Sequence, residues 1–466
     1  MTQPLLQKRT LLMLMLSGLP QVSLADEPPW VNLLPQWHWY GSNTLRMENY
    51  QNYGDETASP YPEEGEQAFD EFFLNFNNRR NPYDTWRGQV YGVLNASDYR
   101  SDERGVVPER ISLVRDLGTG DTPHRLEMGD YFGYFSYRTL QRSLKGVQIE
   151  FQPAVGPSGR RHSVQILAGE NQSQWRDLDV GENFTVGGSW LVDDQQFGRW
   201  SFNWVHNLRD PDDKLGLLRR DQDVFSIAAE KEFSFSAQDM TFEGELANFS
   251  GDHNGVAGAS GEDRDELGVF LQMSGKSKRW PLTYRLRFED YGQDYQPAGA
   301  VVTPDRRSRE AHAGWRFDSG LLLRARIQNF EDGVELANTL DTDTYGINLS
   351  GPFFAAHVKN LTGNLSAYVQ NADDSDNTVD RETRNVALNL NKPLPMDWNG
   401  RLGLFYQSID DDVAGAADSV IRQVALSGDH AIAIGPFTGT VTPGVLWRGL
   451  RGGITRGNEW SPTLAL

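Results

Sequence analysis

The sequence LTYRLRFE, at residues 282–289, alternates between apolar and polar side chains at every step. Leu282, Tyr284, Leu286 and Phe288 fall on one side of an extended chain, and the two arginines and the glutamate fall on the other. Successive side chains of a β-strand point to opposite faces of the sheet. The pattern therefore predicts a strand with one apolar face and one strongly polar face.

The same period of two recurs along nearly the whole chain. It is clear in RWSFNW at 199–204 and in LRARIQ at 323–328. Such segments run from 66–78 to 437–447, about 20 in all, and 35–53 is a further candidate. No pattern of an amphipathic helix interrupts the series. We therefore predict an all-β protein.

Composition and charge narrow the classes of function. The chain has 466 residues, with 64 Asp and Glu against 44 Lys and Arg, which gives a net charge of −20. An acidic chain is a poor partner for nucleic acid, because phosphate binding needs a basic surface. The absence of cysteine excludes disulfides, zinc ribbons, iron–sulfur clusters and thiol nucleophiles. We expect no cofactor and no nucleic-acid partner.

The N-terminus predicts export. Residues 1–25 have the form of a secretory signal peptide, with Lys8 and Arg9 before an apolar run at 11–20 and a small-residue site ending at Ala25. That run is shorter than the roughly 20 residues that a membrane-spanning helix needs. We expect residues 26–466 to form one domain, because no change in composition and no linker divides them.

Three all-β architectures compete for such a chain. A propeller or β-helix should show a repeat of fixed period, and a sandwich of this length should show several domains with linkers. A transmembrane barrel should show alternating segments of about 10 residues with aromatic residues near the membrane interfaces. Aromatic residues such as Trp200, Trp315 and Trp447 stand near segment ends, and tight turns such as 318–320 alternate with long acidic loops such as 249–264. A mean hydropathy of −0.56 agrees with a barrel, since only half of each strand faces lipid.

In these features the sequence resembles the Gram-negative outer-membrane β-barrel proteins, broadly the porin-like and export-barrel group. The resemblance implies a single large antiparallel transmembrane β-barrel of about 20–22 strands in the outer membrane. It also implies two partners, the lipid of that membrane and the barrel-assembly machinery. One departure concerns the end of the chain, because such proteins usually finish on a strand with a terminal aromatic residue. This sequence ends SPTLAL at 461–466, so either its closing strand is atypical or closing strands are missing.

The residue types needed for catalysis or metal binding do not gather in recognisable motifs. No two of the eight histidines have the spacing of a zinc site, and no G-x-S-x-G motif occurs. Only His162 and Ser163 bring a histidine and a serine together in the manner of barrel phospholipases, and on a strand they would point to opposite faces. We therefore expect no catalytic residue, no metal site and no enzyme, with a barrel hydrolase as a weak alternative.

The segment 128–138, MGDYFGYFSYR, has five aromatic residues between Tyr131 and Tyr137. It could fold inward as a constriction or a ligand shelf. We favour the other interpretation, an aromatic girdle where a strand leaves the membrane.

Five arginines share the polar side of three consecutive predicted strands: Arg285, Arg287, Arg316, Arg324 and Arg326. We expect them to point into the lumen, with Glu289 and Glu310 nearby. They are either a structural ladder of ion pairs or a basic path for an anionic substrate. The function we expect is a polar or water-filled passage for diffusion or export of a polar, in one interpretation anionic, solute or polymer. The alternative is a structural, assembly or secretion-associated barrel with an occluded lumen.

Overall fold

The computed structural model describes residues 37–50, 65–97, 104–118, 120, 122–153, 155, 159–172, 175–176, 178, 180–211, 219–252, 263–354, 357–413, 417–434, 437–452 and 457–465. These residues form 22 strands and no helix that could span a membrane. The strands are β1 (Trp37–Tyr50), β2 (Gly65–Asn81), β3 (Asp84–Asn95), β4 (Gly105–Leu117), β5 (His124–Ser136), β6 (Leu140–Phe151), β7 (Arg161–Glu170), β8 (Asn183–Asp194), β9 (Gly198–Arg209), β10 (Arg220–Ser234), β11 (Gln238–Asp252), β12 (Asp263–Ser277), β13 (Leu282–Tyr291), β14 (Arg306–Arg316), β15 (Leu322–Asp332), β16 (Leu340–Pro352), β17 (Thr362–Asp374), β18 (Asp380–Pro393), β19 (Trp398–Asp411), β20 (Ser419–Ile434), β21 (Phe437–Gly452) and β22 (Gly457–Ala465).

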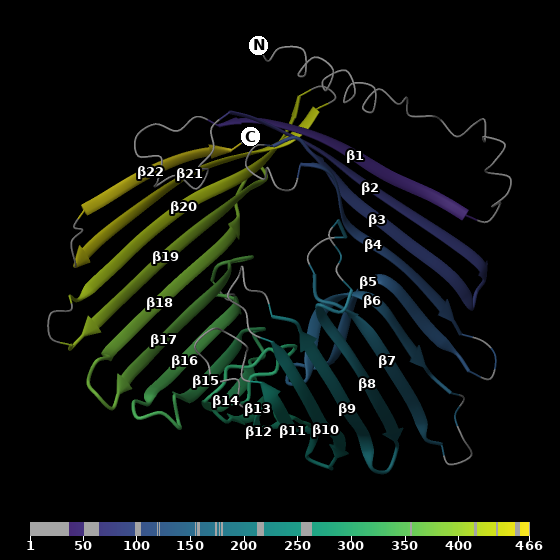
Figure 1. The fold of residues 1–466 in the computed structure, drawn as a ribbon. Coiled ribbons are helices and arrows are strands. Elements are labelled where there is room, and N and C mark those ends of the chain that lie inside the picture. Colours follow the sequence, from purple (N-terminus) through teal and green to yellow (C-terminus); the bar gives the residue numbers. More distant parts are fainter. Residues whose placement is uncertain are drawn as a thin grey trace.

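The strands form one antiparallel sheet in which each strand pairs with its neighbours in the sequence. Figure 1 shows that this sheet curls around a central space, from β1 through β12 and back to β22. Within the described residues, β1 pairs with β2 and β22 pairs with β21. The prediction of an all-β chain with 20–22 antiparallel strands is confirmed.

One strand, β22, was not predicted from the sequence. β22 covers Gly457–Ala465 and includes Pro462, which lacks the amide hydrogen that a ladder needs. Pro462 stands opposite Val445 of β21. A proline is tolerated there because β22 has a ladder on one side only in the described residues. The predicted signal peptide, residues 1–25, lies outside the described residues.

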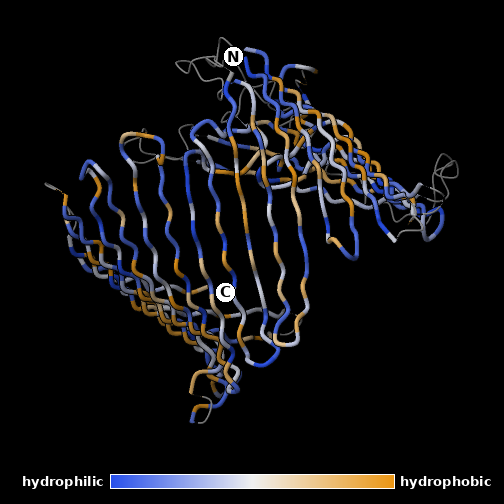
Figure 2. Tube along the Cα trace, turned by 90° about the horizontal axis from the view of Figure 1, so that it is seen from below, coloured by the Kyte–Doolittle hydropathy of each residue, from blue (hydrophilic) through white to orange (hydrophobic). Residues whose placement is uncertain are grey.

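The two faces of the sheet differ as the alternation predicts. Large apolar side chains are exposed along one face, among them Phe225, Ile227, Leu246, Leu271, Ile327 and Ile347. Neighbours along the same strands point to the opposite face, and many of them are polar or charged, such as Ser226, Glu245, Gln272 and Arg326. Figure 2 shows this change between hydrophobic and hydrophilic residues along the strands. We call the apolar side the outer face and the other side, which borders the central space, the inner face.

The two ends of the sheet also differ. The connections after odd-numbered strands include the long segments 210–219, 253–262 and 292–305. Most connections after even-numbered strands are short, such as 82–83 and 195–197. Antiparallel strands place all connections of one parity at one end. The structure therefore has one end of mainly long loops and one of mainly short turns, as the spacing of the segments predicts.

Candidate functional site

The ladder of the sheet is interrupted where β5 meets β4. Their pairing stops at Ser112 and Gly129, and the rest of β5 pairs with β6 alone. Gly129 has a φ of 92°, and a Cβ at this position would lie 2.0 Å from the carbonyl oxygen of Ile111. Only glycine adopts this conformation without strain at such a close approach. The glycine therefore allows β5 to bend away from the wall.

The next residue, Asp130, satisfies the groups that the bend leaves without a ladder partner. Its carboxylate accepts hydrogen bonds from the amide of Ile111 at 2.7 Å and from the indole of Trp175 at 2.6 Å, and it pairs with Lys145. Trp175 in turn donates its own amide to the carbonyl of Pro108 on β4. Trp175 thus lies against the edge of β4 that β5 has left.

Beyond the bend, the β5–β6 hairpin packs against the inner face of the wall. Tyr131, Leu140 and Leu144 of the hairpin form a buried cluster with Leu167 of β7 and Val205 of β9. Figure 1 shows the hairpin inside the ring of strands. The interpretation of segment 128–138 as an interfacial girdle is therefore wrong. One side of β5 packs in this way, because Tyr131 is buried, whereas Phe132 and Tyr134 on its other side are exposed.

Arg138, at the turn of the hairpin, reaches strands that lie far away along the sheet. Its guanidinium donates to Glu245 of β11 at 3.2 Å, to Glu289 of β13 at 3.0 Å and to the hydroxyl of Tyr291 at 3.1 Å. Its Cζ atom lies 3.4 Å from the ring centre of Phe270. Burial alone would lower the pKa of Arg138, but Tyr291 and the two carboxylates outweigh it and the pKa is raised. The guanidinium is therefore charged, and it holds the hairpin tip against β11–β13.

The β13–β14 connection, residues 292–305, covers the other side of the hairpin turn. The amide of Val301 donates to the carbonyl of Tyr137, and the amide of Gln141 donates to the carbonyl of Gly299, both at 2.7 Å. The hydroxyl of Tyr295 donates to the carbonyl of Arg138 at 2.9 Å. Burial raises the pKa of Tyr295 far above its ordinary value. Hairpin and connection thus form one packed body inside the sheet.

The arginines predicted from the sequence share the inner face. The register aligns Arg285 with His312 and His312 with Arg326, and it places Arg287 opposite Glu310. Side chains that stand opposite each other in a ladder point to the same face. Arg324, opposite Gly314, and Arg316, four residues beyond His312, follow the same alternation.

Three of these arginines have acidic partners. Arg285 lies 3.5 Å and Arg326 3.1 Å from the carboxylate of Glu310, whose side chain is 9% exposed. Arg287 lies 2.8 Å from Glu289, which also binds Arg138. This part of the set is an ion-pair ladder, and it joins the arginines to the hairpin through the shared carboxylate of Glu289.

The other two arginines, Arg316 and Arg324, are exposed and form no ion pair with the described residues. A groove of about 480 Å³ is lined by Arg324 together with Lys276, Arg285 and His312. The absence of a side chain at Gly314 leaves this groove open, because a Cβ at this position would lie 2.7 Å from the hydroxyl of Thr283. A second groove, of about 430 Å³, continues from Arg324 past Arg326 toward β17.

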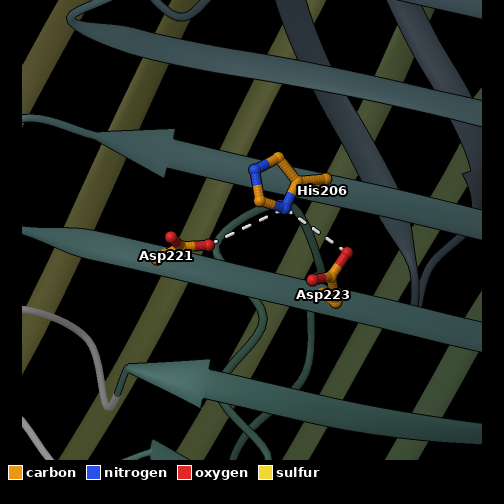
Figure 3. A group of neighbouring side chains, drawn as sticks. All are labelled: His206, Asp221 and Asp223. Atoms are coloured by element: carbon orange, nitrogen blue, oxygen red, sulfur yellow. Dashed lines mark ion pairs between the residues drawn. The ribbon is translucent and has the colours of Figure 1, made fainter.

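A different cluster, on the outer face, arises from register alone. His206 stands opposite Asp223, and its Nδ1 lies 3.3 Å from Asp223 and 3.8 Å from Asp221, as Figure 3 shows. In the described part of the chain this is the group whose geometry would suit a shared metal ion. Trp204 donates to Asp223 at 2.9 Å, and Arg219 pairs with Asp221 at 3.2 Å. A search of the sequence for metal-binding motifs misses this group, because its residues come from two different strands.

The residues considered for a hydrolase do not meet. His162 stacks on Trp190 with 6.1 Å between the ring centres, whereas the hydroxyl of Ser163 donates to Glu150 at 2.7 Å. They project to opposite faces of β7, as the alternation predicts.

No protein-family model and no curated protein sequence matches the chain. Several solved structures of outer-membrane proteins are similar to it. OccK10 of Pseudomonas aeruginosa is 12% identical with a TM-score of 0.37, and the match covers 75% of this chain and 98% of that one. OprD of the same organism is 11% identical with a TM-score of 0.37, covering 80% and 92%. The translocation pore of the P pilus usher PapC is 10% identical with a TM-score of 0.36, covering 90% and 100%.

Proposed function

We propose that this chain forms a passage across an outer membrane for polar, preferentially anionic solutes, and that the β5–β6 hairpin narrows the passage. The support for a membrane location is the outer face. Ile227, Leu246 and Ile347 are at least half exposed although they occupy the middle of long strands. A soluble protein rarely leaves so continuous an apolar surface in water. In lipid the same surface is the expected one.

The observation that carries the anionic preference is the pair of arginines without carboxylate partners. Arg285, Arg287 and Arg326 have carboxylate partners, whereas Arg316 and Arg324 add positive charge to the inner face, and Arg324 lines both grooves. In a water-filled space, unpaired guanidinium groups attract anions and repel cations. The preference is therefore set chiefly by Arg324 and Arg316 rather than by all five arginines.

The occluded barrel is the rival function, and the contacts of the hairpin favour it. Arg138 ties the hairpin tip to β11 and β13, and Tyr291 and Tyr295 pack beside it. A tip held on both sides lowers the free cross-section of the central space. The two functions differ in whether ions pass while these contacts are intact.

A planar-bilayer measurement separates the two functions. Purified, folded protein is inserted into a bilayer, and the reversal potential is recorded in a gradient of KCl. We expect an anion-selective current for the wild type and a shift toward cation selectivity for Arg324→Gln. Screening acts over about 8 Å at 0.15 M salt, so the shift should be largest in dilute KCl.

Arg160→Gln is the matched control, because Arg160 pairs with Asp194 near the short turns and away from the grooves. It should leave the reversal potential unchanged. A folded protein that passes no ions, with the hairpin shortened or intact, would contradict the passage. A current whose reversal potential ignores Arg324 would contradict the anionic preference alone.

A further inference from the structure

A second group of arginines lies where the hairpin meets β9 and β10. Arg209 and Arg220 stand opposite each other at the long-loop ends of these strands. Arg142 comes from β6, just after the hairpin turn, and it and Arg209 lie close enough to Arg220 for their charges to repel it. None of the three belongs to the arginine ladder on β13–β15. Like charges placed together at a buried position need an explanation.

Two members of this group, Arg142 and Arg220, have no carboxylate partner among the described residues. Arg220 is 7% exposed, and its Nη2 atom donates a hydrogen bond to the amide oxygen of Asn183 at 3.2 Å. Its Nε atom is buried without an acceptor. Arg142 makes no hydrogen bond or ion pair with the described part of the chain, and its Nη1 is buried without an acceptor.

This region also contains a neutral donor without an acceptor and an acidic side chain that does not pair with the arginines. The Nδ2 atom of Asn207, 1% exposed, also has no acceptor, although its Oδ1 accepts a hydrogen bond from Thr185. The carboxylate of Glu170 accepts from the backbone amides of Gly181 and Asn183 and forms no ion pair with the three arginines. The inner face here thus offers N–H donors in excess of acceptors.

Burying a cation or an N–H donor without a partner costs free energy, so such groups are normally paired. Guanidinium groups match the two oxygens of a carboxylate or phosphate with parallel hydrogen bonds. The unsatisfied N–H groups of Arg142, Arg220 and Asn207, with the positive charge of Arg209 close to Arg220, therefore suit a ligand that carries negative charge on several oxygens.

We propose that Arg142, Arg220 and Asn207, with the charge of Arg209, bind an oxyanion, either a phosphate or a carboxylate group of a solute. The site would hold this group near the turn of the hairpin, next to the 292–305 connection. The proposal does not require an open channel, because binding can be measured on the folded protein in detergent. It therefore stands or falls separately from the proposed passage.

The test compares unfolding of the full chain in detergent with and without two probes at constant ionic strength. The probes are inorganic phosphate and a trimer of galacturonate, which carries carboxylates only. We expect at least one probe to raise the urea midpoint of the wild type in a saturable manner. Arg142→Gln and Arg220→Gln should each weaken its apparent affinity by about tenfold or more, because each removes a charge-assisted contact.

Arg142→Gln also has an effect that a merely structural arginine would not show. Without any probe, this variant should be at least as stable as the wild type, since it removes an unpaired charge. Arg306→Gln is the control, because Arg306 forms an ion pair with Asp332. It should lower the midpoint without a probe but keep the full response to the probe. Should Arg142→Gln fail to fold, Arg142→Lys and ³¹P line broadening of phosphate replace it.

The outcomes are distinct. A response to phosphate alone, or to galacturonate alone, supports the oxyanion site and identifies the group it takes. No saturable response of the wild type to either probe overturns the proposal. A response that Arg142→Gln and Arg220→Gln both retain at full affinity also overturns it, since the anion would then bind elsewhere.

Discussion

At the scale of single residues, alternation assigns faces correctly but does not reveal what covers each face. On β9, Trp200, Phe202 and Trp204 are exposed on the outer face, as their spacing predicts. Asn203 points to the inner face. In the structure Asn203 is 4% exposed and hydrogen-bonds Ser189 and Ser226 beneath the hairpin. We therefore expect Asn203→Arg to destabilise the protein, because the larger side chain would displace both hydrogen bonds at a buried position.

Phe202→Arg tests the outer face. If Phe202 contacts lipid near the middle of the membrane, the arginine should lower the free energy of unfolding by roughly 2–4 kcal/mol. Ser201→Arg, one position along the strand and on the inner face, should cost about 1 kcal/mol or less. A urea titration of folding into lipid vesicles measures both. Equal losses at the two positions would mean that β9 does not separate lipid from a polar interior.

At the scale of elements, the sequence predicts the strands far better than it predicts the hairpin. An alternation with a period of two can be recognised from adjacent residues alone, so LTYRLRFE identifies β13 without any tertiary information. The inward bend of β5 depends on Gly129 approaching Ile111 and on Arg138 meeting Glu245, more than 100 residues away. The oxyanion group depends likewise on register and on the hairpin's path. No local sequence pattern predicts the approach of Gly129 to Ile111 or the contact of Arg138 with Glu245.

Gly129→Ala tests the bend. The new Cβ would meet the Ile111 carbonyl, and the positive φ would strain it, so we expect a loss of roughly 2–4 kcal/mol in the free energy of unfolding. Gly105→Ala is matched in φ, at 96°, but its Cβ would meet nothing within 4 Å. It should cost only about 1–2 kcal/mol. Equilibrium unfolding in urea gives both values, and equal costs would show that the close approach at Gly129 is unimportant.

At the scale of the whole molecule, the proposed passage requires that the outer face of the sheet contacts lipid and the inner face contacts water. The chain has no cysteine, so single cysteines report each side without a background. Ile347→Cys, on the outer face, should resist a membrane-impermeant maleimide when the protein is in liposomes. Ser366→Cys, which lies on the inner face in the next strand and lines the second groove, should react. Reaction rates in the reverse order would show that the faces are assigned the wrong way round.

The most direct test of a passage that the hairpin narrows is the single-channel conductance of Arg138→Gln, measured beside the wild type and Arg160→Gln. Arg138 is held by two carboxylates and a tyrosine, and it fixes the hairpin tip inside the sheet. Loss of its charge should free the tip, so the variant should show a larger conductance or more frequent large openings than the other two proteins. Identical conductance in all three proteins, with the variant correctly folded, would contradict a passage that the hairpin narrows.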